Sequence, residues 1–182
     1  PSRSDCLMCH SRAAKFAIGL TNAQLNRDVE IEGRTQNQIE ALIALGIAKP
    51  KGAPPKSNAP RHVDPYDTSA ALADRARSYL AINCAHCHVP EGGGNTLMDL
   101  SPAASSERQH LVDAPPQHGE LGLPDARIIA PGNVGRSVLP VRIATRGATG
   151  QMPPVGTLAP DPVGIQLLMQ WIQELPAPKS EH

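Results

Sequence analysis

The four cysteines of this 182-residue chain occur as two close pairs, and a histidine directly follows each pair. The pairs read Cys6-Leu7-Met8-Cys9-His10 and Cys84-Ala85-His86-Cys87-His88. Two thiols three positions apart on a helical turn can reach the two vinyl groups of one porphyrin, and the adjacent imidazole then offers a fifth ligand to the iron. The spacing therefore predicts two covalently attached haem c groups. The attachment residues are Cys6, Cys9, Cys84 and Cys87, and the axial iron ligands are His10 and His88.

Two other uses of the cysteines explain less of the sequence. A zinc site built from both pairs would have ribbon-like spacing, but it would leave the two following histidines without a role. A disulfide within each pair, of the thioredoxin type, needs a βαβ context that the sequence lacks. Only haem attachment uses all four cysteines and both of the histidines that follow them.

A methionine between prolines is the candidate sixth ligand of the second haem. Met152 precedes Pro153 and Pro154 and comes shortly before the last amphipathic segment. A stiff, extended loop of this kind can present a thioether to the open face of the iron, and thioether ligation raises the potential, as suits an electron carrier. A lone methionine is otherwise most often core filler.

The sixth ligand of the first haem is less well specified. Met98, in the loop after the second motif, is the leading candidate because a thioether suits an electron carrier. A second imidazole is the other common axial ligand, which His62, His110 or His118 could supply. A vacant or water-bound iron is the remaining option. We take Met169 as core, and we expect Met8 and His86, inside the attachment loops, to face the wrong way to close their own sites.

Other residues could support the second haem. The carbonyl of the Pro131-Gly132 turn could orient His88 by accepting its other ring N–H. Three arginines, Arg136, Arg142 and Arg146, could bind haem propionates, although a solvated face fits them equally well.

The elements that must position these residues are predicted to be short helices between long irregular loops. Thr21 with Gln24, and Thr35 with Gln38, have the spacing of capping boxes and predict helices at 21–27 and 36–45. A third helix is expected to begin at Asp67 or Thr68 and to enter the second cysteine pair. A short one is expected at 137–146, and a last one after Asp161 as N-cap and Pro162 in the first turn. No segment alternates like a strand, so the predicted fold class is all-α.

The expected organisation has four parts. Residues 1–47 form an N-terminal haem-binding segment that continues upstream, 48–66 a proline-rich linker, 67–176 the second haem domain, and 177–182 a disordered tail. Only 2% of the residues are aromatic, so a porphyrin is expected to fill core volume that rings usually occupy. The formal net charge is zero, which gives no field toward nucleic acid or anionic lipid. No apolar run reaches the roughly 18 residues of a membrane span.

Taken together, residues 68–175 resemble a class I cytochrome c domain: a helix enters the attachment motif, a loop follows, then Met-Pro-Pro and a final helix with Trp171-Ile172. The phrases Arg75–Leu80 and Leu20–Asn26 are similar to a narrower family, the dihaem c-type modules of bacterial periplasmic proteins. That resemblance implies a class I cytochrome c-like helical fold. It also implies a location in the periplasm or at the cell surface, an upstream fused domain, and redox partners: a secreted donor dehydrogenase and an acceptor cytochrome or oxidase.

The predicted function is electron transfer, in which the protein fixes the iron ligands and the cofactor does the chemistry. No catalytic residue is assigned, and an electron carrier is favoured over an enzyme. The alternative is a dihaem peroxidase-like enzyme in which an open-coordination first haem reduces peroxide. The coordination of the first iron discriminates between the two.

Overall fold

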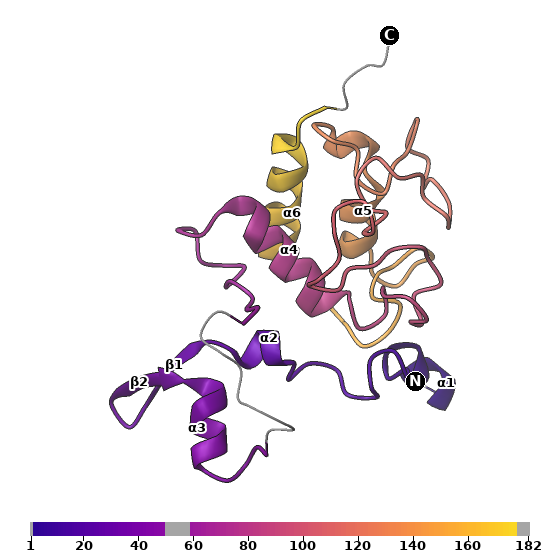
Figure 1. Ribbon diagram of the computed structural model, residues 1–182. Helices are drawn as coiled ribbons and strands as arrows, with labels where there is room; N and C mark the ends of the chain where they lie inside the picture. The colour runs from indigo at the N-terminus through magenta and orange to yellow at the C-terminus, as the bar shows by residue number, and fades with distance from the viewer. Residues whose placement is uncertain (1, 50–58, 178–182) are drawn as a thin grey trace.

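The computed structural model describes residues 2–49 and 59–177 (Figure 1). The helices are α1 (Arg3–Cys9), α2 (Asn22–Leu25), α3 (Gln38–Ala44), α4 (Leu72–Asn83), α5 (Val138–Ala144) and α6 (Pro162–Glu174), with a 3₁₀ turn at Val134–Arg136. Two strands, β1 (Asp28–Ile31) and β2 (Arg34–Asn37), lie between α2 and α3. Position 1, nine positions of the predicted linker (50–58) and positions 178–182 of the predicted tail lie outside the described residues.

The prediction of an all-α fold was wrong, because β1 and β2 pair as an antiparallel hairpin. Its register sets Asp28 opposite Asn37 and Ile31 opposite Arg34. The two turn residues, Glu32 and Gly33, both have positive φ, of 52° and 73°. Positive φ at both central positions is typical of the type I′ turn, whose twist matches that of paired strands. Val29 and Ile31 alternate with charged residues, a short strand signal that the sequence analysis missed.

Helix starts follow local side-chain chemistry where a cap is available. Thr21 accepts from the backbone of Gln24, whose side chain bonds back to Thr21, so the first predicted capping box is confirmed. Asp161 accepts from the N–H groups of Val163 and Gly164, which confirms it as the N-cap of α6. A side-chain oxygen at this position satisfies N–H groups that have no partner within the helix.

Two predicted helix starts were wrong. The N-cap of α3 is Asn37 rather than Thr35, which belongs to β2. Helix α4 begins at Leu72, after Ala71, while Asp67 binds the N–H and hydroxyl of Ser69 in a preceding turn. In both cases a neighbouring element or turn takes the residue that local spacing offered as a cap.

The core lies where α4 packs against α6, with α5 beside them (Figure 1). Its buried members include Ala76, Tyr79 and Leu80 from α4 and Leu168, Trp171 and Ile172 from α6. Gly164 lets the two helices approach, because a Cβ at this position would overlap the ring of Tyr79. This packed pair carries the second cysteine motif at the C-terminal end of α4.

The N-terminal elements are joined to this core through residues 59–63. The backbone N–H of His62 donates to the carbonyl of Ala23 at 3.0 Å, and that of Val63 donates to the hydroxyl of Ser78 at 3.1 Å. The side chain of Asn26 donates to the carbonyl of Ala59 at 3.0 Å. Residues 59–63 of the predicted linker are therefore hydrogen-bonded to both α2 and α4.

Candidate functional site

The first cysteine motif lies on α1. Ser2 and Asp5 form a capping box at its start, and both Cys6 and Cys9 belong to the helix. His10 directly follows the helix, and its Nδ1 lies 2.8 Å from the carbonyl oxygen of Phe16. A ring N–H held by a backbone carbonyl fixes the tautomer and leaves Nε2 free to bind a metal.

The second motif begins where α4 ends, and it is more deeply enclosed. Nδ1 of His88 lies 3.0 Å from the hydroxyl of Thr96, so its Nε2 is again the free nitrogen. Burial, with smaller effects from His86 and His118, lowers the pKa of His88 to about 4. The imidazole is then neutral at physiological pH, which is the metal-binding form. Thr96 therefore has the orienting role that we had offered to the Pro131-Gly132 turn, whose Gly132 carbonyl accepts from Gln173.

One apolar cavity, here called cavity 2, brings together Cys84, His88 and Met152. Its volume is about 80 Å³. The apolar walls come from several segments: Leu100, Leu111, Ile128, Val138, Leu139 and Ile143. Met98 and His118 also line this cavity. The structure thus places a thiol, a neutral imidazole and two thioethers around one enclosed space.

Of the two methionines, Met152 is held on both sides by helix α5 and the residues after it. Its N–H donates to the carbonyl of Arg142 at 2.9 Å, and its own carbonyl accepts from Arg146 at 3.3 Å. Arg142 also donates to the carbonyls of His118 and Gly150. These two arginines therefore bind backbone carbonyls of the loops that enclose cavity 2.

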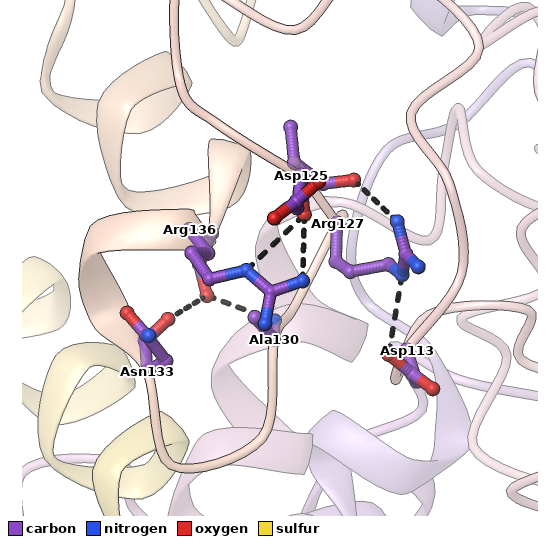
Figure 2. A network of polar contacts seen from close by, with 8 residues as sticks. Asp113, Asp125, Arg127, Ala130, Asn133 and Arg136 are labelled. Carbon is purple, nitrogen blue, oxygen red and sulfur yellow. Dashed lines mark hydrogen bonds and ion pairs between the residues drawn. The ribbon is translucent and has the colours of Figure 1, made fainter.

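A polar network joins residues of the segment 113–137, which runs up to the start of α5 (Figure 2). Arg136 donates from Nη2 to the carbonyl of Asp125 at 3.0 Å, and Arg127 pairs with Asp113 at 3.2 Å (Figure 2). The hydroxyl of Ser137 is buried and bridges the N–H of Ala130 and the carbonyl of Asn133. The Arg136 side chain thus donates hydrogen bonds to the backbone of this segment.

The two cysteine motifs meet in space although 75 residues or more separate their cysteines in the sequence. Ligand atoms of Cys9, His86 and Cys87 all lie within 4.8 Å of one another, and this group could bind a metal ion. The thiol of Cys87 lies 3.4 Å from the carbonyl of Met8. Burial, together with the nearby Cys9 thiol, raises the pKa of Cys87 to about 12, so the thiol is protonated at neutral pH.

A second, larger cavity, here called cavity 1, opens beside this meeting point. Its volume is about 690 Å³, and its lining comes from the segments 13–26, 59–62, 81–89 and 101–102. Two imidazoles, those of His62 and His86, lie in its walls. Burial lowers the pKa of His62, and burial followed by the charge of His10 lowers that of His86. Nδ1 of His86 is buried and has no hydrogen-bond partner among the described residues.

Three of the four residues predicted as sixth ligand of a first haem line one of the two cavities. Met98 and His118 line cavity 2, next to the second motif, while His62 lines cavity 1. His110 is exposed. From the sequence, His86 was weighed only as a ligand of its own site, and neither Thr96 nor the Phe16 carbonyl was predicted. No periodic pattern marks these three: Phe16 and Thr96 contact histidines six and eight residues earlier through irregular segments, and His86 meets Cys9 only through the fold.

No protein-family model, curated protein or solved structure matches this chain. The functional assignment therefore depends on the residues and their geometry. Among the helices in residues 2–49 and 59–177, none has the length and apolar character needed to cross a bilayer.

Proposed function

We propose that this protein is a dihaem c-type cytochrome that transfers electrons between redox proteins outside the cytoplasm. The observation that carries the proposal is the lining of cavity 2, where Cys84, His88 and Met152 lie around one apolar space. In a haem c of an electron carrier these residues would serve as one attachment thiol, the fifth ligand and the sixth ligand.

The residues around both motifs suit a porphyrin in their chemistry. Each axial histidine has its Nδ1 engaged, His10 by the Phe16 carbonyl and His88 by Thr96, so Nε2 is available to iron. Cavity 1, at about 690 Å³, falls within the roughly 300–1,000 Å³ of typical ligand pockets. Cavity 2, at about 80 Å³, is smaller, so a porphyrin there would push apart the loops that carry Thr96–Leu100 and Met152.

The bound haem would supply the one-electron chemistry, and the chain would hold and tune it. Apolar walls in cavity 2 lower the local dielectric, and Met152 favours the reduced iron, so this haem is the high-potential centre. Covalent haem attachment is carried out on exported proteins, so we propose a periplasmic or cell-surface location. A secreted dehydrogenase is the proposed donor and a cytochrome or oxidase the acceptor, through small interfaces that separate quickly.

The test combines a haem count with one substitution. Intact mass spectrometry of the denatured protein, together with a pyridine haemochrome assay, should give two covalently bound haems per chain. Met152→Ala should then lower one midpoint potential by on the order of 100 mV and remove the methionine–iron absorption band, because axial ligands tune haem potentials strongly.

Met98→Ala is the matched control, since Met98 is the other thioether in cavity 2. It should leave the methionine–iron band of the second haem in place and shift the potential of that haem far less than Met152→Ala does. If Met98→Ala removed the band and Met152→Ala did not, the ligand assignment would be wrong. A mass equal to the bare polypeptide, or to polypeptide with zinc, would end the cytochrome proposal itself.

A further inference from the structure

We propose that His86 of the second attachment loop is the sixth iron ligand of the first haem, so that the loop binding one haem also closes the site of the other. This inference rests on the proposed function and assigns a ligand that the motifs alone leave open. Three observations support it: the buried Nδ1 of His86, which has no hydrogen-bond partner among the described residues, the contact between the two motifs, and cavity 1.

The first observation is the state of the His86 ring. Its Nδ1 is buried without a hydrogen-bond partner among the described residues. A buried polar atom without a partner costs about 1–3 kcal/mol, so such atoms are rare unless water, an ion or a cofactor meets them. A lone pair of a neutral imidazole is also a preferred ligand for iron. The ring therefore has an unmet bonding capacity of the kind that a haem iron satisfies.

The second observation is the distance between His86 and the first motif. A ring nitrogen of His86 lies within 4.8 Å of the Cys9 and Cys87 sulfurs. Once each thiol adds to a vinyl group, neither cysteine remains as a thiolate, and His86 is the one member of this group that keeps a strong metal-binding atom. Cys9 would carry the first porphyrin at its edge, so His86 lies next to that ring.

The third observation is the space available. Cavity 1 has a volume of about 690 Å³, and His86 contributes to its wall. Ala13 and Ala14, which follow His10 by only a few residues, contribute to the same wall, as do Ala81 and Ala85. Small apolar side chains of this kind leave room for a flat ring close to the backbone. The cavity thus joins the segment after His10 to His86, while Cys6, Cys9 and His10 themselves lie outside its lining.

His62 is the competing imidazole in cavity 1. Its backbone is fixed to Ala23, but it does not belong to the group formed by Cys9, His86 and Cys87. Met98 and His118 line cavity 2 instead. His86 is therefore the candidate that both the first motif and cavity 1 share.

Two consequences follow from this assignment. The first haem would have two imidazole ligands, and the second one imidazole and one thioether. Because a methionine ligand raises the potential, the first haem would be the lower-potential centre and would pass electrons to the second. The loop Ala85–Cys87 would then connect the iron of one haem to the thioether of the other.

The experiment uses the haem-loaded full chain and begins with the unsubstituted protein. Electron paramagnetic resonance and near-infrared spectra should give one bis-histidine and one histidine–methionine haem, both low-spin. Carbon monoxide is then added to the reduced protein as a probe for an open iron. We expect His86→Ala to bind one carbon monoxide per two haems, where the unsubstituted protein binds almost none, and added imidazole should restore the low-spin spectrum.

His62→Ala removes the competing imidazole and should leave the first haem low-spin and closed to carbon monoxide, and the exposed control His110→Ala should behave like the unsubstituted protein. If His86→Ala fails to retain both haems, His86→Met answers the same question, because a thioether at this position should double the methionine–iron band per chain. The inference is overturned if the unsubstituted protein has no bis-histidine haem, if neither His86 variant alters the first haem, or if His62→Ala opens it. In each of these cases two attached haems would still support the proposed function, whereas absence of attached haem would remove both.

Discussion

At the scale of single residues, each predicted axial histidine has its Nδ1 in contact with a neighbouring group, and this contact leaves Nε2 for a metal. His10 has its Nδ1 at the Phe16 carbonyl, and His88 has its Nδ1 at the Thr96 hydroxyl. The two partners differ in how firmly they orient the ring, because a backbone carbonyl is held in place whereas a hydroxyl can rotate. Gly94 is required beside His88, because a Cβ at this position would lie 2.6 Å from Nδ1.

The contact between Thr96 and His88 gives a prediction for the proposed second haem. Thr96→Val keeps the shape of the side chain and removes the hydroxyl, which accepts a hydrogen bond from the Nδ1–H when Nε2 binds iron. The imidazole then becomes a weaker electron donor to iron, and the potential of the methionine-ligated haem should rise by on the order of tens of mV. A redox titration measures this shift. Thr96→Ser keeps the hydroxyl and should restore most of the original potential, and a fall in potential would contradict the assigned contact.

At the scale of elements, α6 holds the core helix α4 in place, and its start depends on one carboxylate. Asp161 accepts from the N–H of Val163 at 3.1 Å and of Gly164 at 3.0 Å, and its other oxygen accepts from Tyr66 at 2.7 Å. Partial burial raises the pKa of Asp161, but the hydrogen bonds from Gly164 and from the tyrosine hydroxyls outweigh it, so the pKa lies below its usual value.

Removing this cap should destabilise the protein. Asp161→Ala leaves two helix N–H groups without a side-chain acceptor, and the free energy of unfolding should fall by about 1 kcal/mol. Denaturant unfolding followed by circular dichroism measures the change. Asp161→Asn retains a capping oxygen and should be closer to the unsubstituted protein at neutral pH. Equal stability of the alanine variant would show that α6 does not need this cap.

The same residue gives a pH dependence. The folded pKa of Asp161 is lowered, so its ionised form contributes stability above the unfolded pKa of about 3.9, and that contribution is lost as the pH falls through the folded value. The difference in unfolding free energy between the unsubstituted protein and Asp161→Asn should therefore shrink on acidification below about pH 4. A difference that stayed constant across this range would contradict the lowered pKa.

At the scale of the whole molecule, a glycine-rich loop joins the N-terminal segment to the core. Residues 92–94 follow the second motif, and the backbone of Gly93 passes so close to Met8 that a Cβ would overlap the Met8 carbonyl. The same region includes the contact between Cys87 and Met8. Close backbone approach is thus what brings the two motifs together.

Gly93→Ala should separate the N-terminal segment from the core. The added methyl group must displace either α1 or the loop, because the atom it meets belongs to the backbone and cannot rotate away. Limited trypsin digestion should then cleave after Arg12 or Lys15 several times faster than in the unsubstituted protein. Gly135→Ala is the control, since its Cβ would meet only the side chain of Asn133, at 3.4 Å. Equal digestion of the two variants would mean that this contact does not hold the segment.

The sequence by itself determined the features that depend on near neighbours. The C-x-x-C-H motifs, the capping box of Thr21 with Gln24, and the Asp161 cap all act within a few residues, so their spacing is enough to predict them. The hairpin was within reach, since Val29 and Ile31 alternate and Glu32-Gly33 forms the turn, but four-residue strands give a weak periodic signal. The all-α prediction failed at this point.

Only the tertiary structure decided which groups share a space. Cys87 meets the carbonyl of Met8 across a separation of 79 residues, and His86 joins Cys9 because of that contact. Met98 and Met152 line one cavity, while His62 lines another. Such pairings depend on how packed helices and loops fold back on one another, and residue spacing along the chain carries no record of that distance in space.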